Sequence, residues 1–333
     1  MTGIGRRDFL KGSLATVATA GSFMLLPNEA RADYYIRSRT VSGMTYVFLS
    51  DVAAYYGTQI QRRGDTILLA SRTRRLQVDV NKRRALVNNV VIDLGNAIRE
   101  DKGTVLLSER DLTLQLDPIL RAWALPRQSI KRIVIDPGHG KDDPGAEGEK
   151  YKEKEVVLQI SGRLQGELQA RGYEVVMTRS ADTFLELDDR PAVARRVQAD
   201  LFLSIHVNSA GKVNSEPNGI ETFYATPAGL PHTADKDAQK STVGGNRFDR
   251  LNTRLAFDLH RYLIGTTQAN DRGIKRMRWR VLNTPPCPAV LLELGFLTNR
   301  QEERNLGSAA YQAKLAASIA NGVVAYHHAV NHA

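Results

Sequence analysis

The second half of the chain carries nearly continuous apolar runs separated by amphipathic segments. The runs read RIVID, EVVMTR, LFLSIHV, IETFYA and AVLLELGF. Such runs, rather than strict alternation, are typical of strands buried on both faces of a mostly parallel sheet. Helical periodicity marks residues 155–172, 250–263 and 309–327. The alternation of strands and helices predicts an α/β domain over residues 131–330, with a mostly parallel twisted sheet flanked by helices.

Residues 33–125 follow a different pattern of short strand candidates and two strand–cap–helix units. The segment TYVFLSDVAAYYG predicts a strand and then a short helix capped by Ser50 or Asp51. The segment GTVLLSERDLTLQLDPIL repeats this order with Ser108 as the cap. We therefore expect a small α+β accessory domain over residues 33–125, joined to the α/β domain by a linker at residues 126–130.

The two repeated units resemble the N-terminal domain of copper amine oxidases, which occurs as an accessory module in some cell-wall enzymes. Residues 33–125 contain no cluster of metal-ligand residue types, so no copper is expected there. The alternative is a generic small α+β module.

Residues 1–32 have the order of an export signal. A paired arginine in GRRDFLK precedes an apolar stretch over residues 14–26, which is shorter than the ~20 residues that span a membrane. Small residues at Ala30 and Ala32 suit a signal peptidase. The pattern resembles a bacterial twin-arginine signal. It predicts a signal peptide, export to the periplasm or cell envelope, and no membrane span after cleavage; a basic start before a short core helix is the alternative.

Composition narrows the choice of partner. The formal net charge of +10 suits anionic partners, which include nucleic acid, a membrane face and an acidic cell-wall polymer. No recognised nucleic-acid motif occurs and the chain has an export signal, so nucleic acid is not expected.

The one cysteine, Cys287, lies between prolines with no adjacent base, which favours a packed small residue over a nucleophile.

Two histidines follow two of the predicted strands. His139 lies in DPGHG after the first run, and His206 ends the run LFLSIHV. The carboxyl ends of parallel strands meet at one edge of the sheet, where functional residues gather. Each histidine alone is compatible with an ordinary turn or strand-edge residue. Glu153 precedes the first amphipathic helix, where an acid also favours the helix dipole. Two imidazoles and one carboxylate with an open position describe a catalytic zinc site.

Glu293 interrupts the last apolar run, AVLLELGF. A buried carboxylate is costly unless something pairs with it. The residue is therefore either half of a buried salt bridge or a general base or acid that faces metal-bound water.

Five motifs stand in the order of one known family. The chain resembles the zinc-dependent N-acetylmuramoyl-L-alanine amidases of the type-3 amidase family over residues 131 to about 328. The motifs are IVIDPGHGKDDPGA, KEKEVVLQI, VMTRSADTFLELDDRPAVA, ADLFLSIHVNS with NGIETFY, and PAVLLELGFLTN. The resemblance implies one zinc per chain held by His139, Glu153 and His206, with Glu293 as the catalytic residue.

The implied reaction is hydrolysis of the amide between N-acetylmuramic acid and L-alanine of peptidoglycan, with an envelope activator protein as a further partner. A zinc peptidase acting within the stem peptide is the alternative. Asp136 is the candidate for orienting His139, because metal-bound histidines usually have such a partner. Asn208 is a substrate or scaffold candidate, and the helix pattern around Arg190 favours a scaffold role.

The sequence departs from the family pattern at three places. Lys141 stands where the family often has glycine, and Glu155 stands where aspartate is common. The choice of Glu153 over Glu155 therefore depends on the register of the motif. In some relatives, the segment that corresponds to residues 225–250 holds a helix that covers the zinc. Here the segment is polar and lacks an apolar stripe. We expect no blocking helix, and we expect His232 in this segment to be a loop residue.

Overall fold

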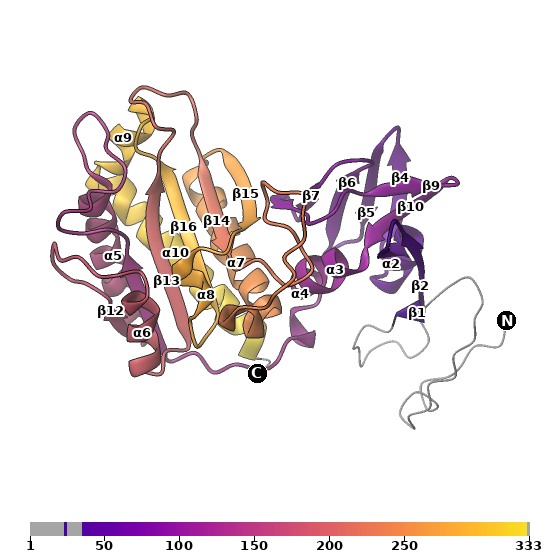
Figure 1. The fold of residues 1–333 in the computed structure, drawn as a ribbon, viewed down its shortest axis with the longest axis horizontal. Coiled ribbons are helices and arrows are strands. Elements are labelled where there is room, and N and C mark those ends of the chain that lie inside the picture. Colours follow the sequence, from indigo (N-terminus) through magenta and orange to yellow (C-terminus); the bar gives the residue numbers. More distant parts are fainter. Residues whose placement is uncertain (1–22, 25–34, 332–333) are drawn as a thin grey trace. The chain divides into compact units, whose positions relative to one another are not determined.

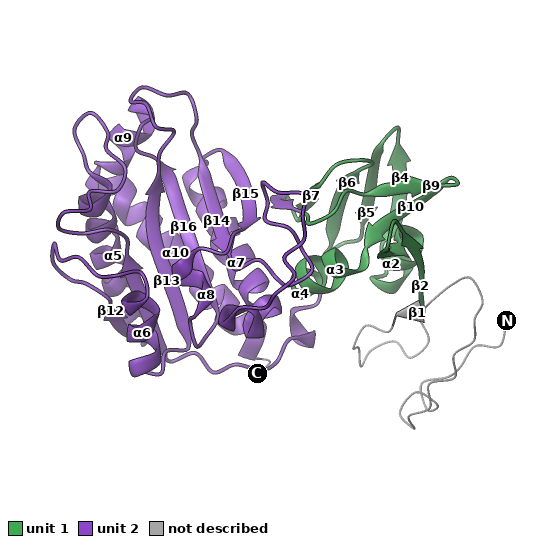
Figure 2. Ribbon diagram, viewed as in Figure 1, with its two compact units in different colours: residues 1–89, 94–120 green, residues 90–93, 121–333 purple. Residues whose placement is uncertain are grey.

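The computed structural model describes residues 23–24 and 35–331 (Figure 1). Contacts divide the chain into two compact units (Figure 2). The second unit consists of Val90–Asp93 and the chain from Arg121 onward, and the remaining described residues form the first unit. The signal peptide predicted for residues 1–32 lies outside the described residues, apart from the two-residue strand β1 (Phe23–Met24).

The first unit is built from antiparallel strands and short helices. One sheet has the order β1, β2 (Ile36–Val41), β3 (Met44–Phe48), β10 (Thr104–Ser108) and β9 (Arg99–Asp101). A second run of antiparallel neighbours is β4 (Gln59–Arg63), β5 (Thr66–Ala70), β6 (Arg75–Asp79) and β7 (Arg84–Val87). The helical segments are α2 (Leu49–Tyr55), α3 (Glu109–Asp111), a π-helical turn (Leu112–Leu116) and α4 (Asp117–Leu120).

One of the two predicted helix caps is present. The Ser108 side chain accepts a hydrogen bond from the backbone N–H of Asp111, as the sequence predicts. The prediction of Ser50 or Asp51 as the cap of α2 is wrong, because the helix begins at Leu49. The Asp51 carboxylate instead accepts hydrogen bonds from the Arg37 guanidinium at 2.7 and 2.8 Å. Bidentate charge-assisted bonds of this kind are stronger than a neutral cap.

The second unit is an α/β domain with a mostly parallel sheet, as predicted. Its strand order is β12 (Glu174–Met177), β11 (Arg132–Pro137), β13 (Leu201–Asn208), β16 (Ala289–Phe296), β14 (Ile220–Tyr224), β15 (Asp271–Arg276) and β8 (Val90–Asp93). β14 and β16 pair antiparallel, and the other described pairs among these strands are parallel. Four of the five apolar runs form strands that are buried throughout or nearly so, and the fifth forms β12 at the sheet edge.

Helices cover this sheet and bury its apolar side chains. The helices are α5 (Glu153–Gln169), α6 (Asp189–Arg196), α7 (Asp249–Thr267), α8 (Arg280–Asn283), α9 (Arg300–Leu306) and α10 (Ala309–Asn331), with 3-10 turns at Ala122–Ala124 and Gly244–Phe248. Helix α10 packs against both α5 and α7. Helices α6 and α8 pack against one another and against the strands, and Val193 and Val281 join Phe202 and Leu291 in one apolar cluster. No helix in the described part of the chain is long and apolar enough to cross a membrane.

Side chains alternate between the two faces of a strand, and this alternation places the site. His206 lies four residues after Phe202 on β13, and Glu293 lies two residues after Leu291 on β16. Both therefore belong to the face that α6 and α8 cover. The two strands are in parallel register with His206 opposite Glu293, so these side chains are neighbours at the carboxyl end of the sheet.

Two expectations about less regular segments hold in the described residues. Residues 225–243 contain no helix, and the 3-10 turn Gly244–Phe248 leads directly into α7. Cys287 is buried at 4% exposure, and burial raises the pKa of its thiol. A buried thiol of raised pKa carries little thiolate, so it fits the packed residue that the sequence suggests.

Candidate metal centre and active site

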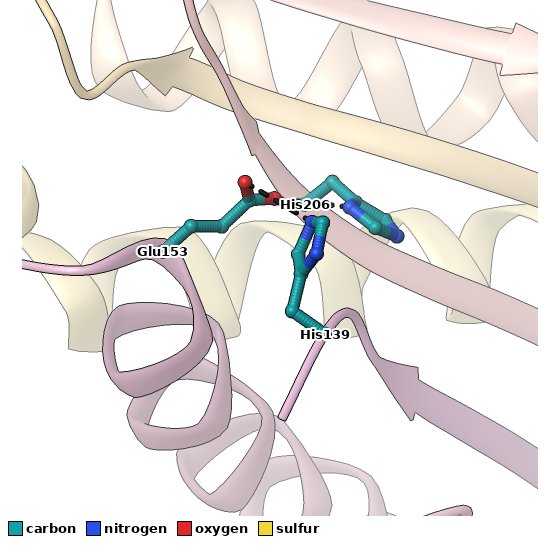
Figure 3. Close-up of side chains that lie close together, drawn as sticks. All are labelled: His139, Glu153 and His206. Carbon is teal, nitrogen blue, oxygen red and sulfur yellow. Dashed lines mark hydrogen bonds and ion pairs between the residues drawn. The ribbon is translucent and has the colours of Figure 1, made fainter. Parts of the chain in front are cut away.

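Three side chains from separate elements converge at the carboxyl edge of the sheet. His139 lies on the loop after β11, Glu153 is the first residue of α5, and His206 is on β13 (Figure 3). The Glu153 carboxylate contacts both rings, through Oε2 to His139 Nε2 at 3.1 Å and through Oε1 to His206 Nδ1 at 3.0 Å. Ligand atoms of all three residues lie within 4.8 Å of one another. The three metal-ligand candidates proposed from sequence thus form one cluster in the fold.

The glycines of the first motif allow this close approach. A Cβ on Gly138 would lie 2.2 Å from the His206 ring, and one on Gly145 would lie 2.5 Å from Glu153 Oε2. Real Cβ atoms do not approach other atoms so closely, so a larger residue at either position would displace a side chain of the cluster. His139 has a φ of 60°, in the left-handed region that non-glycine residues rarely adopt.

Glu153 is held in place as an ionised carboxylate. It is only 3% exposed, and its oxygens also accept hydrogen bonds from the backbone N–H groups of Ala146 at 2.7 Å and Val207 at 3.0 Å. Burial by itself would raise the pKa of Glu153, but the hydrogen bonds and charges of the two histidines hold that pKa below its ordinary value. Glu155, the alternative that the sequence left open, is exposed and makes no contact with the cluster.

His139 is oriented by Asp143 rather than by Asp136. Its Nδ1 lies 2.8 Å from Asp143 Oδ2, which leaves Nε2 for Glu153 and the cluster. Burial would lower the pKa of His139, but hydrogen bonds and charges of Glu153 and Asp143 outweigh this and raise it. The sequence suggested Asp136 for this role, and the structure differs because that carboxylate lies inside the sheet, fully buried.

Asp136 instead anchors the loop that carries His139. Its oxygens accept hydrogen bonds from Thr178, Ser204 and Arg190. The buried Arg190 guanidinium also donates to the carbonyl of Pro137 at 2.8 Å and to the carbonyl of His139 at 3.0 Å. The scaffold role suggested for Arg190 fits these contacts, because the guanidinium ties the loop to the end of β11.

Glu293 lies beside the cluster and is nearly buried at 9% exposure. Within the described structure its Oε2 has no hydrogen-bond partner. Burial raises the pKa of Glu293 well above its ordinary value, and the nearby charges of Glu153 and Glu221 raise it further. A buried carboxyl group with a free oxygen and a raised pKa is suited to accept and return a proton.

Asn208 is the last residue of β13, two positions after His206. Its side-chain N–H group donates to Glu221 Oε2 at 3.2 Å, and its Oδ1 accepts from the backbone of Ser209. Glu221 is itself bound by Arg272 and Lys275, each at 2.6 Å. The contacts of Asn208 are therefore those of a scaffold residue whose side chain also borders the cavity.

A cavity of about 330 Å³ opens over these groups. Its polar end is formed by the cluster together with Glu293 and Asn208, and its other walls are mostly apolar. The lining residues are His139, Ala146, Glu153, Leu187, His206, Val207, Asn208, Ser209, Trp279, Arg280, Val281, Leu291 and Glu293. His232 is not among them, and its ring contacts Thr226 at 2.6 Å, as expected of a loop histidine. A cavity of this volume is large enough for part of a substrate rather than for water alone.

Sequence reasoning did not identify Asp143, Leu187, Trp279 and Arg280 as parts of the site. Asp143 had a local signal, since it lies four residues after His139 in the same motif. Trp279 and Arg280 precede and begin the short helix α8, where no periodic pattern marks a functional position. Trp279 packs on Phe223 with ring centroids 4.4 Å apart, and this contact holds it at the cavity wall.

The fold and the cluster define an α/β protein with a candidate metal centre at the carboxyl end of its sheet. A family model described as N-acetylmuramoyl-L-alanine amidase matches residues 133–325. The amidase AmiA of Escherichia coli K12 is 34% identical over 221 residues, which cover 59% of this chain and 76% of AmiA.

Solved structures agree with this match. The catalytic domain of the amidase CwlV from Bacillus (Paenibacillus) polymyxa var. colistinus is 36% identical with a TM-score of 0.50, covering 59% of this chain and 98% of that one. CwlD from Clostridioides difficile, solved in complex with the GerS lipoprotein, is 27% identical with a TM-score of 0.50, covering 59% and 98%. The chain belongs to the N-acetylmuramoyl-L-alanine amidase family. It is a peptidoglycan hydrolase that cleaves the amide bond between N-acetylmuramic acid and L-alanine.

Proposed function

We propose that this amidase uses one zinc ion held by His139, Glu153 and His206, with Glu293 as the general base. The observation that supports this most directly is the Glu153 carboxylate lying between two imidazoles, each within 3.1 Å. Two histidines and one glutamate are a donor set that catalytic zinc sites use. The lack of side chains at Gly138 and Gly145 leaves the space in which His206 and Glu153 lie.

The donor set suits zinc in charge as well as in geometry. The Glu153 carboxylate is ionised, and the contact of His139 with Asp143 fixes which ring nitrogen faces the cluster. When bound, zinc supplies a Lewis acid that lowers the pKa of water toward ~7 and polarises a carbonyl. Asp143 and the backbone donors to Glu153 keep two of the ligands oriented.

Glu293 would carry the proton of the reaction. Glu293 lines the cavity and lies opposite His206 in the register of the sheet, and its Oε2 has no hydrogen-bond partner among the described residues. In the ionised form it accepts the proton of the attacking water, and the raised pKa makes it a strong enough base to hold that proton. It then returns the proton to the nitrogen of L-alanine as the amide bond breaks. Val281 and Leu291 line the same cavity with apolar side chains.

The test is digestion of purified sacculi by the mature protein, with and without a chelator and with zinc restored. Mass spectrometry of the released products should show intact stem peptides that begin with L-alanine. Products cut inside the stem peptide would instead support a zinc peptidase. Full activity in metal-free protein would refute the zinc assignment.

We also propose that residues 1–32 direct export by the twin-arginine route to the periplasm or cell envelope. This rests on the order of the paired arginine, the short apolar stretch and the small residues before the cut. Replacing Arg6 and Arg7 together with lysine should block export, which fractionation of cells measures. Export through another route would leave the mature protein outside the cytoplasm in the variant.

For the remaining regions we propose an accessory role for residues 33–125 before a catalytic domain over residues 131–330. Binding to peptidoglycan or to an envelope activator protein are the two roles to be tested. The similar amidase CwlD was solved bound to a lipoprotein, which supports looking for a protein partner. Sedimentation with sacculi distinguishes the two, because only a peptidoglycan-binding role predicts weaker sedimentation when residues 33–125 are absent.

A further inference from the structure

A buried carboxylate on helix α9 holds the loop that precedes the metal-ligand candidate Glu153. Glu303 is 4% exposed. Its Oε1 accepts hydrogen bonds from the backbone N–H groups of Lys150 at 2.6 Å and Tyr151 at 3.2 Å. The two partners lie about half the chain away in sequence, so this is a tertiary contact and not part of a local turn. Buried carboxylates are costly unless such donors compensate them.

The loop is fitted closely to α9 at two further points. Gly148 has no side chain, and a Cβ there would lie 2.4 Å from Glu303 Oε1 and 2.9 Å from the carbonyl of Leu297. At the end of α9, a Cβ on Gly307 would lie 2.3 Å from the Tyr151 ring. Glycine at both positions lets the loop and α9 come into contact, and the Glu303 carboxylate lies at this contact.

The same loop sets the position of Glu153. Gly148 N–H donates to the carbonyl of Tyr151 at 2.9 Å, which closes the turn two residues before Glu153. The backbone N–H of Glu153 donates to the carbonyl of Ala146 at 2.8 Å, and the N–H of Ala146 donates to Glu153 Oε2 at 2.7 Å. The loop is thus tied to Glu153 at its base and to Glu303 at its tip. A shift of the tip would move the first turn of α5 and the carboxylate with it.

We propose that Glu303 is a positioning residue that holds Glu153 in register at the metal centre through the loop of residues 148–151. This rests on the proposed ligand role of Glu153. Glu303 does not line the cavity, so its effect reaches the metal centre only through the loop. The expected consequence of its loss is weaker zinc binding rather than a direct change in chemistry.

Glu302, the preceding residue on α9, provides a matched control. It is also a partly buried glutamate that accepts backbone hydrogen bonds, from Gly219 at 2.9 Å and Phe296 at 2.7 Å. Neither donor belongs to the loop before Glu153. Removing either carboxylate therefore takes away two backbone hydrogen bonds from the same helix, but only Glu303 connects to the candidate ligand.

The test measures zinc affinity by competition with a chromophoric chelator, together with melting temperature, on the full mature chain. Glu303→Ala should weaken zinc binding about tenfold or more, the range seen when supporting partners of metal ligands are removed. Glu303→Gln should stay within about threefold of wild type, because its amide oxygen still accepts both N–H groups. Glu302→Ala should lower the melting temperature without changing zinc affinity by more than about threefold.

The outcomes separate this inference from the proposed function. Wild-type protein that binds no zinc refutes the zinc site itself. Zinc bound by wild type and equally well by folded Glu303→Ala refutes only the role of Glu303, as does an equal loss in Glu302→Ala. Should Glu303→Ala fail to fold, Glu303→Asp carries the test, since the shorter side chain keeps the charge but draws back from the loop. Unchanged zinc affinity in Glu303→Asp, together with faster hydrogen exchange at Lys150 and Tyr151, would then overturn the proposal.

Discussion

Replacing Glu293 with glutamine tests the assignment of the general base most sharply. The amide has nearly the volume of the carboxyl group, so the substitution leaves no cavity in β16. It retains a hydrogen-bond acceptor but cannot take up a proton at neutral pH. The ligand candidates His139, Glu153 and His206 are untouched, so bound zinc should be retained at wild-type content.

The size of the effect follows from the role. Loss of a positioned general acid–base costs roughly 10²–10⁴-fold in rate. Since each tenfold corresponds to about 1.4 kcal/mol, this is about 3–5 kcal/mol in the activation free energy. The free energy of unfolding of Glu293→Gln should be unchanged or higher than that of wild type. Burial raises the pKa of Glu293, so the folded metal-free protein disfavours its charge, and a neutral amide removes that penalty.

Glu221→Gln is the matched control for loss of a buried carboxylate in the same row of the sheet. Glu221 lies opposite Glu293 in register but is paired with Arg272 and Lys275 and does not line the cavity. Its replacement leaves two cations without their partner and should lower the melting temperature, while turnover falls by less than about tenfold.

The assay compares zinc content, melting temperature and release of stem peptide from sacculi on the same preparations. Glu293→Gln should keep its zinc and lose turnover. Glu221→Gln should have a lower melting temperature and keep most of its turnover. Near-normal turnover in zinc-loaded Glu293→Gln would show that another residue is the base. Loss of zinc in that variant would mean that Glu293 is instead part of the metal centre.

Three further outcomes are expected. His139→Ala and His206→Ala should each remove most bound zinc, as elemental analysis measures, whereas His232→Ala should keep it because that ring lies outside the cavity. Burial raises the pKa of Asp249 to about 7, so the folded protein holds this proton where the unfolded chain, with a pKa near 3.8, has lost it. This contribution favours folding below pH ~4 and is lost between pH ~4 and ~7, so Asp249→Asn should match wild type at pH 4 and be more stable at pH 8, by at most about 4 kcal/mol in denaturant titrations. A chain starting at Gln128 should fold and keep its zinc but melt below the full mature chain, because it lacks β8. In that strand Ile92 pairs with Ile274, and the Val91 N–H donates to Asp271. Equal melting temperatures would show that β8 contributes nothing to the second unit.

Much of the second unit could be predicted from local patterns. Continuous apolar runs identified β11, β13, β14 and β16 because both faces of those strands are covered by other layers, so no polar alternation interrupts them. Helical periodicity identified α5, α7 and α10 for the same reason, since each buries one apolar stripe. The positions of His139 and His206 at strand ends then followed from the geometry of parallel sheets.

Which side chains contact one another could not be predicted in this way. Asp136 and Asp143 stand in the same motif, and only the folded loop shows that Asp143 reaches the His139 ring while Asp136 is enclosed by Arg190. The short strand β8 belongs to the second unit although it lies among the residues of the first, because its pairing with β15 depends on backbone hydrogen bonds that leave no periodic trace.

The sequence by itself determined which residue types were available for catalysis and at which ends of which elements they would stand. The tertiary structure alone decided their contacts, such as the Glu303 carboxylate seated on the loop before Glu153. The physical reason is the separation along the chain of the residues that interact. Periodicity and capping are set by neighbours a few residues apart, whereas burial, charge pairing and the pKa of a group such as Glu293 depend on what the whole chain brings around it.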